Sequence, residues 1–281
     1  MREIDANAVT ATIARLCMEA NYFLPADVLG ALEKAVQNEP SPAGQEVLRQ
    51  LLENARIARE EQVPLCQDCG IAIVHLEVGQ EVRIVGGDLR AAAEEGVRWG
   101  YRDGYLRKSV VSPPLFSRTN TRDNTPPVVH MDIVPGDRLK VAVAPKGAGS
   151  ENMSALAMLR PADGVEGVID FVVRTVERAG PNPCPPVVVG VGIGGTAEKA
   201  MLLAKRALLR PLGVHHTDSR FAELEKELLQ RINRLGIGPA GFGGLTTALA
   251  VHVETYPTHM ACLPVGVNLQ CHAARHKEAV L

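Results

Sequence analysis

Apolar residues recur at helical spacing through the first sixty residues of the chain. The first such segment carries its apolar side chains at Val9, Ile13, Leu16 and Cys17. Pro25 begins a second segment, and a third runs from about 45 to 61 with Arg and Glu between its apolar positions. Pro64 then ends the helical pattern. The spacing predicts an N-terminal helical region over residues 1–62.

Residues 63–281 change to short apolar runs separated by glycine and proline, with amphipathic segments between them. Strands are predicted at 71–78, 80–85, 187–191, 245–253 and 263–267, and helices at 88–101, 164–179, 196–209 and 219–235. Segments 130–134 and 139–144 flank Pro135-Gly136-Asp137, which predicts a hairpin. We expect an α+β fold in a single domain over 1–281, with helices first, then a mixed β-sheet with helices, and functional residues on its loops.

The composition of the chain excludes several functions. Its 281 residues have a formal charge of -2 and 4% aromatics, so neither phosphate binding nor base stacking on nucleic acid is favoured. No run reaches the ~20 apolar residues of a membrane span, and residues 1–5 lack the apolar core of a signal peptide. We therefore expect a cytoplasmic protein with no membrane partner, whose six cysteines are thiols or metal ligands.

Three cysteines lie in loop-forming contexts beside proline, glycine or polar residues. They are Cys66, Cys184 and Cys271. Three thiolates that converge only through the fold suit a metal or an iron–sulfur cluster with one open position. Structural zinc would require a second C-x2-C pair, and a redox role for Cys66 and Cys69 is disfavoured by the intervening Gln67-Asp68. Cys17 and Cys262 fall in apolar patterns typical of core residues.

Other residues suit the binding of an anion and the transfer of a proton. Lys146 precedes a glycine-rich segment, 147–152, whose backbone N–H groups can approach a carboxylate or small phosphate, although a plain glycine turn is the alternative. Arg107 can bind a carboxylate through two N–H groups. Asp68 stands beside a candidate metal thiol, where it can transfer a proton or merely cap a turn. His259, twelve residues before Cys271, can orient a carboxylate or shuttle protons.

A second glycine-rich turn, 190–196, lacks the complete G-x-G-x-x-G pattern, so it does not indicate NAD binding. Together, however, the short motifs resemble those of the α-subunits of class I iron–sulfur hydro-lyases, the family of fumarate hydratase and L-tartrate dehydratase. The matching stretches are Pro64–Asp68, Leu106–Ser109, Asp123–Pro126, Pro145–Ser154, Cys184–Pro186, Gly192–Thr196 and Val267–Arg275. The resemblance covers about residues 60–281, and the N-terminal helices are compatible with it.

The resemblance implies a set of roles. Cys66, Cys184 and Cys271 would hold a [4Fe–4S] cluster with one iron not bound by cysteine. Asp68, assisted by His259, would be the acid–base partner. The substrate would contact Gln67, Arg107, Lys146 and Gly149. Cys69 departs from the family, which commonly has threonine or another small residue there, and is not expected to be a ligand.

The resemblance also implies a dicarboxylate substrate and a separate β-subunit that supplies the remaining catalytic groups, in an α2β2 assembly. Hydration of fumarate to L-malate is the first expectation, and dehydration of tartrate to oxaloacetate is the alternative. A module that binds or assembles iron–sulfur clusters without catalysis is a third possibility. It would share the cysteines but not the anion-binding residues.

Overall fold

The computed structural model describes all 281 residues and divides into two compact units. Unit 1 comprises Met1–Leu24, Ala55–Ala148 and Arg275–Leu281, and unit 2 comprises Pro25–Asn54 and Gly149–Ala274. Each unit therefore combines segments that are distant in the sequence. The prediction that residues 1–281 form one domain stays a prediction.

Unit 1 is built on a four-stranded sheet with the order β12-β7-β2-β6. These strands are β2 (Ile71–Gly79), β6 (Val128–Val134), β7 (Leu139–Lys146) and β12 (Lys277–Val280). Two short ribbons accompany it, made of β1 (Arg2–Asp5) with β3 (Val82–Val85), and β4 (Val111–Ser112) with β5 (Thr119–Asn120). Alternate residues of β2 and β7 face a core that they share with two helices.

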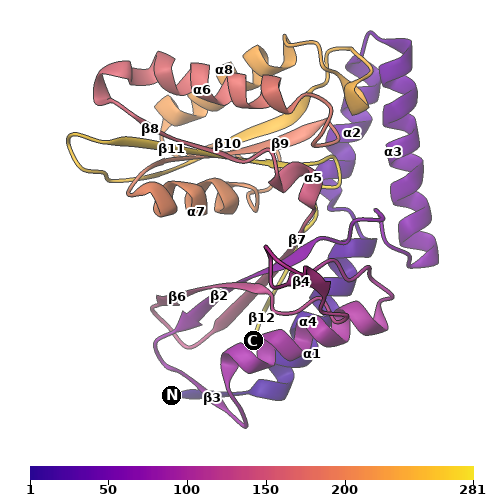
Figure 1. Cartoon of the computed structure of the whole chain (residues 1–281), viewed down its shortest axis with the longest axis vertical. Coiled ribbons are helices and arrows are strands. Elements are labelled where there is room, and N and C mark those ends of the chain that lie inside the picture. The colour runs from indigo at the N-terminus through magenta and orange to yellow at the C-terminus, as the bar shows by residue number, and fades with distance from the viewer. The chain divides into compact units, whose positions relative to one another are not determined.

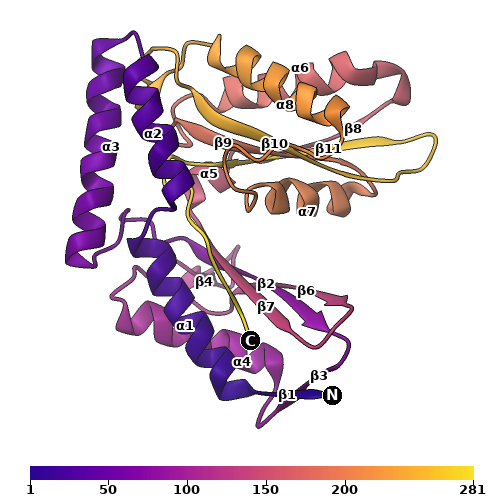
Figure 2. The same ribbon diagram turned by 180° about the vertical axis from the view of Figure 1, so that it is seen from behind.

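Those helices are α1 (Ala6–Tyr22) and α4 (Leu89–Asp103), which Figure 2 shows side by side against the sheet. Each begins at an aspartate whose side chain accepts a backbone N–H of the first turn, Asp5 from Asn7 and Asp88 from Ala91. The apolar stripe predicted on α1 is buried there, and Cys17 is fully inaccessible, as its pattern predicted. Burial of this kind is the main stabilisation of a helix of this length.

The predicted hairpin over residues 130–144 is wrong. Strand β2 lies between β6 and β7, parallel to the first and antiparallel to the second. The turn at 135–137 exists, but its Gly136 carbonyl accepts the N–H of Glu81, which belongs to the tight connection after β2. The turn residues were recognised correctly, whereas the strand inserted between the two arms comes from a segment some fifty residues earlier and leaves no local signal.

Unit 2 contains a second four-stranded sheet, with the order β10-β9-β11-β8. Its strands are β8 (Ala155–Leu159), β9 (Val187–Gly194), β10 (Ala248–Tyr256) and β11 (Leu263–Gln270). One face is covered by α7 (Ala197–Ala207) and the other by α6 (Gly164–Ala179) and α8 (Ser219–Asn233), as Figure 1 shows. The unit also contains α2 (Ala26–Asn38), the short α5 (Ala148–Glu151), which starts at the last residue of unit 1, and the first part of α3 (Pro42–Glu61).

The α+β class, the three N-terminal helices and every long helix predicted after them are confirmed. The structure differs from the prediction in having two mixed sheets rather than one. Each sheet combines parallel and antiparallel neighbours, and every antiparallel pair in these two sheets joins strands that are not consecutive in the sequence. None of the helices combines the length and the apolar composition needed to cross a membrane.

Candidate functional site

The first cysteine loop connects α3 to β2 in unit 1. Its sulfur and carboxylate groups are held by the loop's own backbone, since the Cys66 Sγ accepts the N–H of Asp68 at 3.4 Å. Cys66 is half-buried and Gln67 is exposed. The last residue of the loop, Gly70, has φ +71°, and a Cβ there would lie within 2.7 Å of the Lys146 backbone. Only glycine allows this close approach of the loop to β7.

Asp68 has a fixed carboxylate. Its Oδ1 accepts the Gly70 N–H at 2.9 Å, and its Oδ2 accepts the Ala148 N–H at 2.8 Å. The second of these bonds joins the cysteine loop to the start of the glycine-rich segment, eighty residues later. Each carboxylate oxygen keeps a lone pair beyond these bonds. The arrangement therefore orients Asp68 firmly while leaving it able to exchange a proton.

Three buried side chains anchor the carbonyl groups of this loop. The Tyr101 hydroxyl donates to the Cys69 carbonyl at 2.7 Å, the Asn124 amide donates to the Gly70 carbonyl at 3.1 Å, and the Arg275 guanidinium donates to the Asp68 carbonyl. Tyr101 and Asn124 are completely inaccessible, and Arg275 is 3% exposed. Buried carbonyls left without donors are costly, so these bonds determine the shape of the loop. Sequence reasoning assigned no role to any of the three residues.

Asn124 also organises the segment that carries Arg107. Its Oδ1 accepts the backbone N–H groups of Ser109 at 2.7 Å and Val110 at 3.3 Å. The same amide thus bonds the cysteine loop and the segment that follows Arg107. Asn124 lies in the motif Asp123–Pro126, which was the sequence signal available for its role in holding these two segments.

Cys69 is a buried thiol that connects the loop to Arg107. Its Sγ lies 3.7 Å from the Cys66 carbonyl, to which it donates, and accepts the Arg107 N–H at 3.2 Å. Burial raises the pKa of the Cys69 thiol, while the Arg107 N–H and the charge of Arg275 act in the opposite direction. A thiol held in its neutral form by burial suits a packing role, and the expectation that Cys69 is not a ligand stays a prediction.

The predicted substrate-binding residues of unit 1 differ in accessibility. Arg107 is exposed beside the cysteine loop, as is Gln67. Lys146 is only 4% exposed, at the end of β7. The exposed guanidinium of Arg107 can bind a carboxylate that arrives from solvent. The buried ammonium of Lys146 can bind one only if the carboxylate itself comes close to the end of β7.

In unit 2, the structure brings together the loops of the other two cysteines. The backbone N–H of His272 donates to the Cys184 carbonyl at 3.2 Å, and its ring Nδ1 lies 3.1 Å from the same oxygen. Cys184, with φ 55°, is exposed, and Cys271 is half-buried. A Cβ at Gly149 would lie 3.1 Å from the carbonyl of Asn182, so the glycine-rich segment adjoins the Cys184 loop.

A partly buried polar network holds this glycine-rich segment against the sheet. The Glu151 carboxylate pairs with Lys205 of α7 at 2.7 Å and accepts the Asn268 amide of β11 at 2.9 Å. The Asn268 amide also donates to the Ser154 hydroxyl at 2.6 Å. The network connects α5 to both the sheet and its covering helix, two residues before the β11 end that leads to Cys271.

His259 does not lie near these two cysteine loops. It belongs to the connection between β10 and β11, while Cys271 follows the opposite end of β11. That strand has eight residues, which places the two residues roughly 25 Å apart. His259 is exposed and contributes to a mainly apolar hollow of about 450 Å³ together with Val165, Met260 and Cys262. Cys262, predicted to be buried, is in fact half-buried at this hollow.

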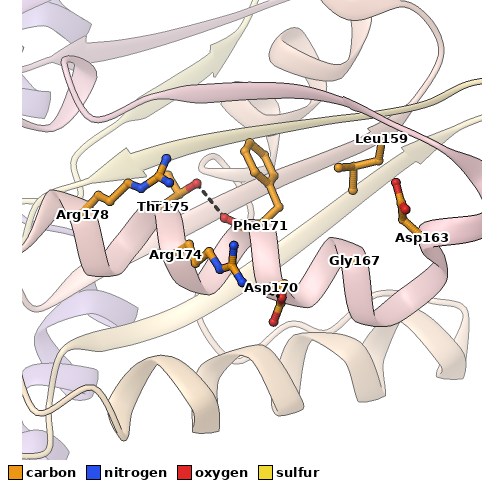
Figure 3. Close-up of a pocket in the computed structure, with 8 residues that line it drawn as sticks. All are labelled: Leu159, Asp163, Gly167, Asp170, Phe171, Arg174, Thr175 and Arg178. Carbon is orange, nitrogen blue, oxygen red and sulfur yellow. Dashed lines mark hydrogen bonds and ion pairs between the residues drawn. The ribbon is translucent and has the colours of Figure 1, made fainter.

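A second hollow, of about 360 Å³, follows helix α6 and strand β8 (Figure 3). Two of its charged side chains form an ion pair, in which Arg174 contacts Asp170 at 3.2 Å. The Thr175 hydroxyl donates to the Phe171 carbonyl within the same helix. None of the predicted site residues lines it. It therefore adds nothing to the cysteine sites.

The three cysteines supply a donor set that suits a thiolate-ligated group. Cys66 belongs to unit 1 and the other two cysteines to unit 2, and no group of three or more His, Cys, Asp or Glu residues lies close enough to hold a metal ion. The environment of the first loop is nevertheless suited to a bound anionic group. Arg275 Nε and Nη1 are buried without hydrogen-bond partners beside this loop. A buried cation with unused donors favours an anion in its surroundings.

Comparison with known proteins agrees with these features. The family model described as fumarate hydratase (Fumerase) matches residues 10–280. The chain is 45% identical, over 95% of both chains, to a Methanocaldococcus jannaschii protein provisionally named L(+)-tartrate dehydratase subunit alpha. It is 33% identical to the L(+)-tartrate dehydratase subunits alpha of Escherichia coli K12 and Shigella boydii, over 96% of this chain and 89% of theirs. The chain therefore belongs to the class I fumarate hydratase and tartrate dehydratase α-subunit family, whose members are hydro-lyases.

Proposed function

We propose that this chain is the α-subunit of an L(+)-tartrate dehydratase, which removes water from tartrate to give oxaloacetate. The observation that carries the choice of substrate is the 45% identity over 95% of both chains to a protein that bears this name. The sequence motifs alone ranked fumarate hydration first. The names of the relatives favour the alternative, so fumarate becomes the second candidate.

The proposed cofactor is a [4Fe–4S] cluster held by Cys66, Cys184 and Cys271. When bound, it supplies a Lewis acid for the departing hydroxyl and an adjacent carboxylate. Two observations support the proposal. The Cys184 and Cys271 loops adjoin one another in unit 2, and Arg275, which has buried N–H groups without acceptors, bonds the carbonyl of Asp68 in the Cys66 loop.

Asp68 is the proposed proton-transfer group. Backbone N–H groups of Gly70 and Ala148 orient its carboxylate, and each oxygen retains a lone pair. A carboxyl group held in one orientation needs little reorganisation to pass a proton, when it is protonated, to a departing hydroxyl group. Arg107, exposed beside it, is the proposed partner of one substrate carboxylate. Gln67, Lys146 and the Gly149 backbone are the further proposed substrate contacts.

A second carboxylate and a proton on the other carbon require more groups than this chain offers near the cysteine loops. We propose that a β-subunit supplies them, since the relatives are named as subunits alpha. His259 lies roughly 25 Å from Cys271 along β11, so within one chain it cannot touch a molecule bound at that cysteine. If His259 assists Asp68, it does so in the site of the second α-chain of an α2β2 assembly.

Co-expression of two inactive α-chains tests this arrangement. One chain carries His259→Asn and the other carries Cys271→Ser, with the β-subunit present. About half of the assemblies should be mixed, and one of the two sites in each then combines an intact cluster with an intact histidine, so the co-expressed population should recover up to about a quarter of wild-type activity. Recovery confined to background would exclude a shared site. Full activity of His259→Asn alone would remove His259 from the mechanism.

The proposed substrate is tested with the anaerobically reconstituted α/β complex. L(+)-tartrate and fumarate are supplied in parallel, and kcat/KM is measured for each. We expect oxaloacetate from tartrate with the larger kcat/KM. A larger value for fumarate would favour the second candidate. A complex that binds a cluster, with broad absorbance near ~400 nm, but turns over neither acid would indicate a binding or assembly module.

A further inference from the structure

Arg275 combines deep burial with an absence of charge neutralisation. It is 3% exposed, and only its Nη2 has a hydrogen-bond acceptor, the carbonyl of Asp68. Its Nε and Nη1 have no hydrogen-bond partner, from a carboxylate or any other group. By contrast, the partly buried Arg210 in unit 2 pairs with both Glu225 and Glu254. Arg275 therefore differs from an arginine retained for an internal ion pair.

An unpaired buried guanidinium is unfavourable by itself. Removal of a charged group from water is strongly unfavourable in a protein unless an opposite charge or a full set of hydrogen bonds compensates for it. The single bond to the Asp68 carbonyl uses one of five N–H groups. Compensation is therefore expected from an anion that the polypeptide alone does not supply.

The surroundings of Arg275 identify where that anion belongs. Its Nη2 bonds the middle of the loop that carries Cys66 and Cys69. Its charge also lowers the pKa of the Cys69 thiol and of the Tyr101 hydroxyl against the larger effect of burial, so both groups lie within its electrostatic reach. Tyr101 and Arg275 are both buried, so they lie on the interior side of the loop.

We propose that Arg275 is a positioning residue for the cluster. It tethers the loop at the Asp68 carbonyl, and it supplies the buried positive charge that offsets the negative charge of the thiolate-bound group at Cys66. This inference rests on the proposed cofactor and adds to it a residue that sets its redox properties. A nearby cation and N–H donors stabilise the reduced, more negative form of an iron–sulfur cluster, so Arg275 raises its reduction potential.

Three replacements distinguish the effect of the positive charge of Arg275 from that of its hydrogen bond to the loop. Each is made in the full chain, which is reconstituted anaerobically with iron and sulfide. Arg275→Gln keeps an amide donor and removes the charge, and Arg275→Met is a second neutral variant. Arg275→Lys keeps the charge and loses the planar fork. Arg83→Gln is the control, because Arg83 is an exposed arginine of the same unit with one surface partner, Glu3. Circular dichroism establishes folding, and a reductive titration followed by visible absorbance gives the midpoint potential.

We expect a more negative midpoint potential in Arg275→Gln and Arg275→Met, and a value close to wild type in Arg275→Lys and Arg83→Gln. Wild-type potentials in the neutral variants would overturn the inference while leaving the proposed cofactor intact. A shift in Arg275→Lys as large as in the neutral variants would also overturn it, because the fork rather than the charge would then matter. A wild-type chain that takes up no cluster would overturn the proposed cofactor and this inference together.

Discussion

Replacement of Asn124 by alanine tests whether the site depends on this single amide. The side chain donates to the Gly70 carbonyl and accepts the N–H groups of Ser109 and Val110. Three buried hydrogen bonds at about 1 kcal/mol each give a loss of about 3 kcal/mol. Asn124 also has φ 64°, a conformation that costs alanine about 1 kcal/mol more than asparagine. We therefore expect the free energy of unfolding to fall by about 4 kcal/mol.

The assay is anaerobic urea unfolding of the Asn124→Ala chain, together with amide hydrogen exchange. Exchange should accelerate at Ser109 and Val110, because the carboxamide oxygen that accepts their N–H groups is gone. Asn120→Ala is the matched control. Asn120 is exposed in the same segment and bonds only Lys108 and Arg122, so its loss should cost less than about 1 kcal/mol. Equal effects of the two replacements, or unchanged exchange at Ser109 and Val110, would refute the reasoning.

The remaining predictions concern the cluster, the acid–base group and acid stability. Replacement of Cys66, Cys184 or Cys271 by serine should abolish cluster absorbance, whereas Cys17→Ser should keep it. If one of the first three variants retained the absorbance, that cysteine would not be a ligand. Asp68→Asn should lower kcat by ~10²–10⁴ with the absorbance intact, and an unchanged kcat would make Asp68 a structural residue. Burial tends to raise the pKa of Glu225, but the Val253 N–H and Arg210 outweigh it and hold this pKa below its ordinary value. The stability it contributes is therefore complete above about pH 4.3 and is lost as the pH falls through the lowered pKa. Thermal unfolding between pH 7 and 3 should show a shallower acid decline in Glu225→Gln, and identical declines would exclude this carboxylate as the cause.

The helices were predictable because their signals are local. Helix α1 shows its buried stripe within seventeen residues, and the aspartates that cap α1 and α4 stand directly before the apolar repeats that they begin. The strands were predictable as apolar runs, but not their partners. A run such as β7 looks the same whether its neighbour is β6 or β2, since the identity of the neighbour depends on chain segments outside any short window.

In the candidate site, too, the residues with local sequence signals were predicted and those that act over long sequence separations were not. Cys66, Asp68 and Arg107 were identified because short motifs surround each of them. The residues that hold these motifs in place were missed, because each acts across a long separation in sequence. Asn124 bonds Gly70 from 54 residues away, and Arg275 bonds Asp68 from 207 residues away. Both lie in short motifs, Asp123–Pro126 and Val267–Arg275, but neither motif shows which distant carbonyl the side chain bonds.

A buried polar side chain becomes informative only when its partners are known. Glu39 is 1% exposed and has no cation, but its carboxylate is compensated by the N–H groups of Leu245 and Thr246, so it is a structural anchor. Arg275 is as deeply buried and bonds one carbonyl, with two donors unused. From the sequence, the two residues are equivalent charged positions next to apolar segments. Their hydrogen bonding distinguishes them. The carboxylate of Glu39 is compensated by backbone N–H groups, whereas the guanidinium of Arg275 has donors without acceptors and therefore requires a further ligand. This asymmetry is the physical reason to look for the missing negative charge at Cys66 rather than at Glu39.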